Sequence, residues 1–219
     1  PEVAGRIAAI NFQEGQRVGK GAVLVRLDPT INEAEVLQAR ANLKLARSKY
    51  ERAVDLAKSN FISGQARDEA ENNLRVAEAA LALVEARLAK TEIRAPFSGV
   101  IGLRSVSVGD YVKEGADIVN LESIDPLKVD FRVPEVYLRL VKAGQSLQVS
   151  LDAFPGKEFE GRVYAVNPLL DAAGRAVVIR AQVKNADASL RPGMFARVRL
   201  ITSESADSLV VPEQTLVPQ

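Results

Sequence analysis

The 219-residue chain lacks the side chains that most often carry chemistry near neutral pH. It contains no cysteine and no histidine. Without cysteine there is no disulfide framework and no thiolate chemistry, a composition compatible with an oxidising compartment. Without histidine the sequence lacks the commonest metal ligand and the commonest general acid–base group. The single methionine, Met194, adds almost no capacity for soft metal ions. We therefore expect no catalytic residues, no cofactor site and no metal site.

Long apolar runs and concentrated charge are also absent. No run approaches the ~18 consecutive apolar residues of a membrane-spanning helix. The 29 basic and 28 acidic residues are spread along the chain, which gives a formal net charge of +1. Because nucleic-acid binding requires a concentrated basic patch, we expect no nucleic-acid partner. No signal peptide is visible. Since Pro1-Glu2-Val3 has the pattern of a mid-strand segment, we expect both ends to lie within a longer protein.

One sequence pattern occurs twice. The stretch EGQRVGKGAVLVRLD at residues 14–28 aligns without a gap to VGDYVKEGADIVNLE at residues 108–122, an offset of 94 positions. In each copy, glycines such as Gly15 and Gly109 separate short β-type runs, as turn glycines with positive φ do. Two copies are too few for a solenoid, which needs about three or more repeats. The repeat therefore predicts two related halves, residues 1–28 and 92–123, that pair into one small β domain.

Between the copies, residues 29–91 have the pattern of a helical hairpin. Apolar residues recur in a seven-residue repeat over about 31–60 and again over about 65–91, and SNFISGQ separates the two runs. The first seam comprises Val36, Ala39, Leu43, Ala46, Tyr50, Ala53 and Ala57. The second comprises Leu74, Ala77, Leu81, Val84 and Leu88. Two heptad helices joined by a short turn predict an antiparallel coiled coil, each arm ~40 Å long at 1.5 Å per residue.

The start of the first helix has two possible caps. Asp28 before Pro29 suits an N-cap followed by proline at the first helical position. Thr30 with Glu33 three residues later fits a capping box. The sequence does not decide between them.

Three leucines, Leu37, Leu45 and Leu83, fall outside the two seams. One interpretation, which we prefer, is that the register drifts, because a 3.6-residue helix does not match a seven-residue repeat. The other is that these side chains face a neighbouring copy of the protein.

From residue 124 to 204 the chain alternates apolar and polar residues in several short runs. This pattern predicts a small antiparallel β-barrel. One short helix is expected between Pro134 and Gly144, and turns are expected around 154–156, 171–174 and 191–193. We expect residues 205–219 to begin a further, membrane-proximal domain. The predicted fold class is mixed α and β, multidomain and elongated.

The repeated β unit resembles the biotinyl/lipoyl carrier fold, which consists of two similar halves. In carriers, the modified lysine lies on a tight turn between the halves. Here the junction after Asp28 opens into the helical hairpin, and no such lysine turn is present. A carrier domain is therefore the least favoured of the functions considered.

The order of segments is similar to that of the periplasmic adaptors, or membrane fusion proteins, of tripartite efflux pumps. The resemblance covers essentially the whole chain and rests on an ordered set of motifs: EGQRVGKGAVLVRLDP, IRAPFSGVIG, VGDYVKEG, LRPGMFARV and VPEQTLVP. LRPGMF and VPEQ resemble the branch that works with resistance–nodulation–division (RND) transporters most closely.

This resemblance implies a non-enzymatic adaptor in the periplasm, anchored to the inner membrane. It would link an inner-membrane RND-type transporter to a TolC-like outer-membrane channel for the export of small molecules. Several copies, six by family resemblance, would associate side by side. The alternative is an adaptor of an ATP-driven exporter or a type I secretion system, in which the same layout occurs.

The resemblance also implies a channel contact at the hairpin tip, at Arg52, Leu56 and Ser63, which match the spacing of a family motif. Arg52 and Leu56 are i, i+4 neighbours on one helix face. The arginine could bond carbonyl or carboxylate oxygens, and the leucine could fill a shallow pocket. The simpler interpretations are that Arg52 is solvated, that Leu56 packs on the partner helix, and that Ser63 caps the second helix.

Overall fold

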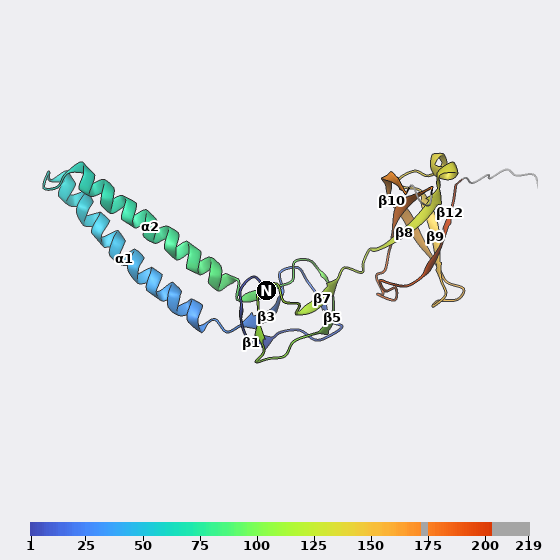
Figure 1. Cartoon of the computed structure of the whole chain (residues 1–219), viewed down its shortest axis with the longest axis horizontal. Helices are drawn as coiled ribbons and strands as arrows, with labels where there is room; N and C mark the ends of the chain where they lie inside the picture. Colours follow the sequence, from blue (N-terminus) through green and yellow to red (C-terminus); the bar gives the residue numbers. More distant parts are fainter. Residues whose placement is uncertain (172–174, 203–219) are drawn as a thin grey trace, which may run out of the picture. The chain divides into compact units, whose positions relative to one another are not determined.

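The computed structural model describes residues 1–171 and 175–202. The chain divides into two compact units, Pro1–Glu122 and the part that begins at Ser123, and Figure 1 labels several elements of each. The predicted further domain at residues 205–219 lies outside the described residues.

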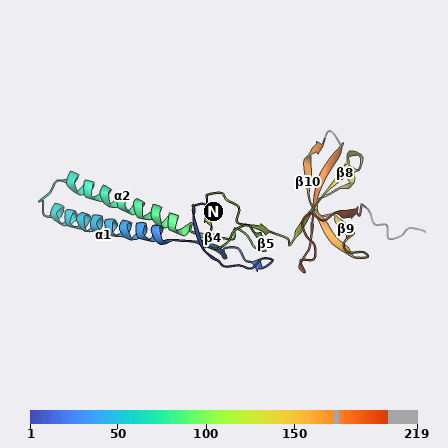
Figure 2. The same ribbon diagram turned by 60° about the horizontal axis from the view of Figure 1, so that its bottom comes forward.

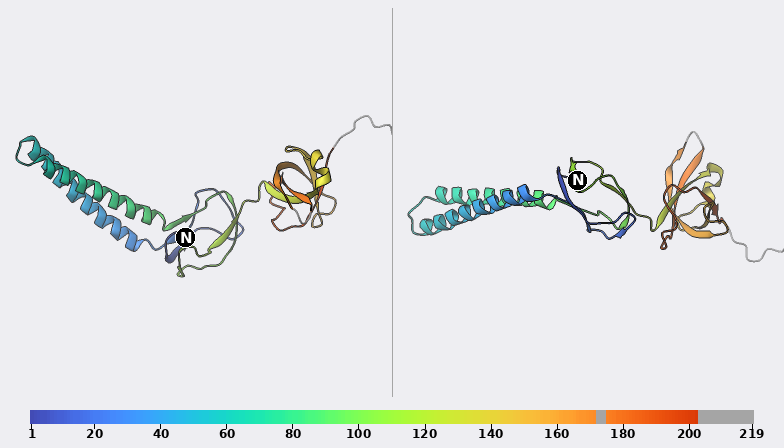
Figure 3. Two further views of the ribbon diagram at one scale, coloured as in Figure 1. Left: turned by 45° about the horizontal axis from the view of Figure 1, so that its top comes forward. Right: turned by 90° about the horizontal axis from the view of Figure 1, so that it is seen from below.

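Unit 1 contains two long helices, α1 (Thr30–Lys58) and α2 (Gly64–Ala89). They lie side by side and run antiparallel in the views of Figures 1, 2 and 3. Along one side, Arg40 pairs with Glu85 at 2.8 Å and Arg47 pairs with Glu78 at 3.7 Å. The structure therefore has the long helix pair that the heptad pattern predicts.

The predicted seams lie between the two helices. Every seam residue of α1 and α2 is buried or half-buried, and Val36 is only 3% exposed. The seven-residue spacing of these positions persists from Val36 to Ala57 in α1 and from Leu74 to Leu88 in α2. Small alanines in both seams allow the helices to approach closely.

The three leucines outside the seams are exposed, so the preferred interpretation of register drift is wrong. Leu37, Leu45 and Leu83 are 66%, 53% and 55% exposed. The reason is geometric: drift amounts to ~20° per heptad, whereas consecutive helical residues are ~100° apart. Leu37 directly follows the seam residue Val36, where no drift has accumulated.

Helix α1 starts with Pro29 as its N-cap residue and without a side-chain cap hydrogen bond, so neither predicted cap forms as stated. Pro29 already has helical dihedrals (φ −90°, ψ −1°), and the Asp28 carboxylate accepts from the Thr30 N–H at 3.0 Å. The capping-box alternative is not what forms. The Thr30 hydroxyl donates to Asp28 at 2.5 Å, and the Glu33 N–H donates to the Pro29 carbonyl at 2.8 Å. Asp28 thus bonds Thr30, the first helical residue, from the position just before the N-cap Pro29.

Two small sheets form the β part of unit 1. Their strands are β1 (Gly5–Ile10), β2 (Arg17–Val18), β3 (Val23–Leu27), β4 (Glu92–Arg94), β5 (Gly99–Arg104), β6 (Tyr111–Val112) and β7 (Val119–Glu122). One sheet has the order β4-β3-β1-β6 and the other β2-β5-β7. Helix α1 follows β3 and α2 precedes β4, so the helix pair begins and ends on neighbouring strands.

The two halves of the repeat exchange equivalent strands. Strand β2 pairs with β5, and the equivalent strand β6 pairs with β1. The Gly15 N–H donates to the Ile101 carbonyl at 2.9 Å, and the Gly109 N–H donates to the Ile7 carbonyl at 2.8 Å. Since each residue of the second bond has a counterpart 94 positions away in the first, the same contact occurs twice with the halves reversed.

Side chains of both halves meet in one core. Ile7 and its repeat equivalent Ile101 are each 1% exposed. The buried members of this core are Ile7, Leu24, Val25, Leu27, Ala95, Ile101, Val112 and Ile118. The two copies thus pair into one β structure, as the repeat predicts.

Unit 2 is a five-stranded antiparallel sheet with one short helix. Its elements are β8 (Leu127–Pro134), the 3-10 helix η1 (Glu135–Leu140), β9 (Ser146–Leu151), β10 (Glu158–Asp171), β11 (Ala176–Val183) and β12 (Ala196–Leu200). The strand order is β12-β9-β10-β11-β8. The predicted turn at 171–174 lies largely outside the described residues. The predicted short helix is present, but only as a 3-10 helix of six residues, a form typical of short helical pieces.

The predicted barrel is present in part. Register shifts in the β10–β11 ladder bend the sheet around an apolar core. Among the described residues β8 and β12 form no ladder with each other, so hydrogen bonding leaves a half-barrel with two edges. Leu138, Val141 and Leu190, which lie outside the strands, complete this core.

Candidate functional site

The tip of the helix pair is built by a C-terminal cap on α1. Asn60 has a positive φ of 55°, a conformation that asparagine tolerates better than most residues. The Asn60 N–H donates to the Ala57 carbonyl at 3.0 Å, and the Phe61 N–H donates to the Leu56 carbonyl at 2.9 Å. These two bonds, closed by a left-handed residue, form a Schellman motif. The cap satisfies the last carbonyls of α1 and fixes where Phe61 leaves the helix.

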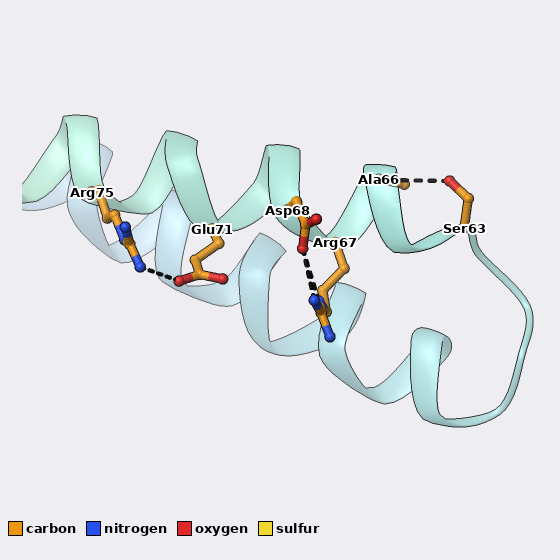
Figure 4. Close-up of polar contacts among 6 residues, drawn as sticks. All are labelled: Ser63, Ala66, Arg67, Asp68, Glu71 and Arg75. Carbon is orange, nitrogen blue, oxygen red and sulfur yellow. Dashed lines mark hydrogen bonds and ion pairs between the residues drawn. The ribbon is translucent and has the colours of Figure 1, made fainter.

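Helix α2 starts at the other side of the same turn. Ser63 is its N-cap, with extended backbone (φ −74°, ψ 157°), and its hydroxyl accepts from the Ala66 N–H at 3.2 Å. Figure 4 shows this contact at the start of α2. The prediction that Ser63 caps the second helix is therefore confirmed. Ser63 as a residue remains exposed, so capping leaves it accessible to a partner.

Arg52 and Leu56 lie on the exposed surface of the last turns of α1. The Arg52 Nε donates to the Ser48 carbonyl at 3.2 Å, within its own helix. Within the part of the chain that the structure describes, Arg52 forms no ion pair. Leu56 is 45% exposed, so packing on α2 leaves nearly half of its surface open. The structure thus brings the three predicted residues to one end of the helix pair.

Phe61 is a tip residue that the sequence analysis did not single out. Its side chain is 78% exposed. The signal that would have found it is the dipeptide Asn60-Phe61, because asparagine at a helix end suggests a left-handed cap and an apolar residue commonly follows it.

The charged residues around the tip are mostly paired with one another. Lys58 pairs with Asp55 at 3.4 Å, and Arg67 pairs with Asp68 at 2.8 Å. Hydrogen bonding to Asp68 raises the pKa of the Arg67 guanidinium above its ordinary value. Figure 4 shows this pair and the Glu71–Arg75 pair one turn further along α2. Exposed ion pairs add little stability, but the positive and negative charges within each pair offset one another.

The two long sides of the helix pair differ. One side carries the ion pairs of Arg40 and Arg47 described above. The other, which we call the grooved face, has a hollow of about 410 Å³ between the helices. Its lining residues are Asn42, Leu45, Ala46, Lys49, Ala66, Glu69, Ala70 and Asn73. Leu45, one of the exposed leucines, is among the residues that line this hollow.

Unit 2 has an open hollow of about 860 Å³ near its first strand, lined by side chains of both charges such as Asp125, Glu160 and Lys184. None of the predicted site residues lies there. Within residues 1–171 and 175–202, no acidic cluster is arranged to hold a metal ion. In the same ranges no helix has the length and hydropathy needed to cross a membrane.

Comparison with known proteins identifies both units. The family model for the RND MFP barrel-sandwich hybrid domain matches residues 1–124, and the model for the CusB-like beta-barrel domain matches residues 127–204. An uncharacterized protein of Haemophilus influenzae is 33% identical over 96% of this chain and 55% of its own length. The multidrug resistance protein MdtA of Pectobacterium carotovorum is 32% identical over 96% of this chain and 56% of its own length.

A solved structure agrees with these matches. A putative efflux transporter from Bacteroides eggerthii has a TM-score of 0.80 and 26% identity, covering 100% of this chain and 70% of that chain. The chain spans about half the length of the curated relatives it matches. One family model covers more than half of the chain. The chain therefore belongs to the membrane fusion protein family, the periplasmic adaptors of RND efflux pumps.

Proposed function

We propose that this protein is a non-enzymatic adaptor that links an inner-membrane RND-type transporter to a TolC-like outer-membrane channel for the export of small molecules. The observation that carries the proposal is the combination of family membership with a long helix pair whose tip exposes Arg52, Leu56 and Ser63. It acts in the periplasm, held at the inner membrane, and unit 2 docks on the transporter. A multidrug resistance protein among the relatives supports export of small molecules.

At the channel, Arg52, Leu56 and Ser63 are the contact residues. Arg52 forms no ion pair among the described residues, so its guanidinium is available to carbonyl or carboxylate oxygens of a partner. Leu56 offers an exposed apolar side chain one turn nearer the tip. The hydroxyl of the exposed Ser63 can donate to a partner while it accepts from Ala66, because a hydroxyl both donates and accepts.

Several copies of the protein, six by family resemblance, associate side by side. Within each copy, the helix pair is an antiparallel coiled coil. The grooved face supports the side-by-side association, because three alanines line its hollow and the exposed Leu45 lies beside them. The opposite side is occupied by ion pairs within the same chain. A neighbouring copy is therefore expected on the grooved face.

The test is site-specific photocrosslinking from position 56 of the full-length protein in its native cells, with captured proteins identified by mass spectrometry. We expect capture of an outer-membrane channel from position 56 and none from the control position 44, an exposed lysine midway along α1. If only another copy of the adaptor is captured, the proposed contact between the tip and the channel is wrong.

Crosslinking from the exposed Val136 of η1 tests the other end of the proposed function. Capture of an RND transporter supports it. Capture of an ATP-driven exporter or a secretion component would assign the protein to that alternative system instead.

A further inference from the structure

We propose that Phe61 and Leu56 act together as one apolar contact element that enters an apolar hollow in the partner at the tip, and that Asn60 positions it. This inference rests on the proposed function, because it names the chemistry of the same tip. Phe61 is 78% exposed and Leu56 is 45% exposed. An aromatic side chain left this open at the end of a helix pair gains free energy only when another molecule covers it.

The Schellman motif joins the two residues. The hydrogen bond from the Phe61 N–H to the Leu56 carbonyl, at 2.9 Å, ties their backbones together although they are five positions apart. In such motifs an apolar contact between the residue after the left-handed position and the residue that accepts its N–H is frequent. Phe61 and Leu56 occupy these two places. The apolar element is therefore held by backbone geometry before any partner arrives, which lowers the entropy lost on binding.

Charge at the tip indicates what the partner surface must be. The neighbouring charges cancel within two pairs, Lys58 with Asp55 and Arg67 with Asp68. Arg52 remains without an ion pair among the described residues, one turn of α1 away from Leu56. The complementary surface is an apolar hollow with carbonyl or carboxylate oxygens on one rim. A strongly charged surface, such as a lipid headgroup layer, does not match this distribution.

Asn60 is the positioning residue. Its φ of 55° is strained for a β-branched side chain but not for glycine. Replacement by glycine keeps the cap, whereas replacement by valine moves the chain at Phe61 without removing any contact group. Comparing these two variants shows whether binding depends on where Phe61 is held, because both variants keep the Phe61 side chain.

The experiment uses the full-length adaptor in its native cells with a photocrosslinker at position 56. Channel capture is quantified in four backgrounds: Phe61→Ala, Asn60→Gly, Asn60→Val and the control Val76→Ala. Val76 is an exposed apolar residue of α2, 68% exposed, in the middle of the helix pair. Thermal unfolding of each purified variant shows whether it is folded.

We expect the yield of the channel crosslink to fall about tenfold or more for Phe61→Ala, in line with the loss of an aromatic anchor. Asn60→Val should lower the yield by a smaller factor, while Asn60→Gly and Val76→Ala leave it unchanged. An unchanged yield for folded Phe61→Ala, with channel capture intact, would overturn this inference and leave the proposed function standing.

A second crosslinker, at position 61 itself, identifies what covers the aromatic ring. Capture of the channel supports the inference. Capture of another copy of the chain or of lipid alone overturns it. If neither position 56 nor position 61 captures a channel in the unmutated background, the proposed channel contact at the tip fails as well.

Discussion

The two copies of the repeat have matching sequences but unequal surroundings. In the first copy, Val25 and Leu27 of β3 are 0% and 2% exposed. Their equivalents in the second copy, Val119 and Leu121 of β7, are only half-buried. The difference follows from strand order, because β3 lies between β4 and β1 whereas β7 is an edge strand. The same side chain at the same repeat position can therefore contribute different amounts of stability, depending on what the topology places beside it.

The largest expected loss of stability comes from replacing the equivalent leucines Leu27 and Leu121. Leu27→Ala should lower the free energy of unfolding of unit 1 by about 3–5 kcal/mol, because it leaves an enclosed cavity. Leu121→Ala should lower it by about 1–2 kcal/mol, because a half-exposed site does not enclose one. Amide hydrogen exchange of the slowest β1 and β5 N–H groups measures both. Equal losses of stability would mean that the difference in burial between Leu27 and Leu121 does not determine how much each stabilises unit 1.

A second matched pair tests the backbone of the two copies. A Cβ on Gly99 would lie 2.5 Å from the Glu122 carbonyl oxygen, whereas one on the equivalent Gly5 would meet only the Leu27 side chain at 3.3 Å. Gly99→Ala should therefore destabilise unit 1 by about 2 kcal/mol or more, since main-chain atoms must move. Gly5→Ala should change stability by less than about 1 kcal/mol, because Leu27 can shift slightly and alanine loses less backbone entropy. The same exchange measurement applies, and similar losses for both variants would contradict the crowding argument.

The smallest expected effect concerns the way the first copy leads into α1. Hydrogen bonds from the Thr30 hydroxyl and then the Thr30 N–H hold the pKa of the Asp28 carboxyl below its ordinary value. A carboxyl with a lowered folded-state pKa stabilises the fold above its unfolded pKa, and the contribution disappears as pH falls through the lowered value. Carbon-detected NMR titration should show this lowered pKa, and Thr30→Val should move it back toward ordinary.

The repeat equivalent of Asp28 is Glu122, which precedes unit 2 and not a helix. Glu122→Gln is therefore the control. In this control, acid should lower the amide-exchange protection of the first turn of α1 as much as in the unmutated protein. In Asp28→Asn, that protection should no longer depend on pH. If exchange protection at the start of α1 is insensitive to acid in the unmutated protein, the stabilising role assigned to the Asp28–Thr30 hydrogen bonds is contradicted.

The sequence allowed the helix pair to be predicted in detail because its signal is local. Each seam residue from Val36 to Ala57 is placed by a seven-residue period that any short window contains. The exchange of β2 and β6 between the halves could not be read in this way. Each is a two-residue strand, Arg17–Val18 and Tyr111–Val112, too short to show alternation.

Exposure was the property that the sequence predicted least well. Leu37 and Phe61 are apolar residues in a helical region, and local pattern alone cannot show whether a second element covers them. The buried Asn185 is the opposite case. Its side-chain amide donates to the Ile124 and Leu190 carbonyls at 2.9 Å each. Because one partner is 61 positions away, no sequence window contains this contact.

The connection of α1 and α2 to neighbouring strands has a consequence for folding. The partners of the exchanged strands are far apart in sequence, and contacts of this kind impose a loop-closure entropy that slows folding. The helix pair consists of contacts that begin across one short turn, and it ends where the Leu27 N–H donates to the Thr91 carbonyl at 2.9 Å. Once formed, it brings the two halves together as if the intervening chain were a few residues long. An apparent insertion thus shortens the effective distance that the β unit must close, and lengthening both helices equally would leave that distance unchanged.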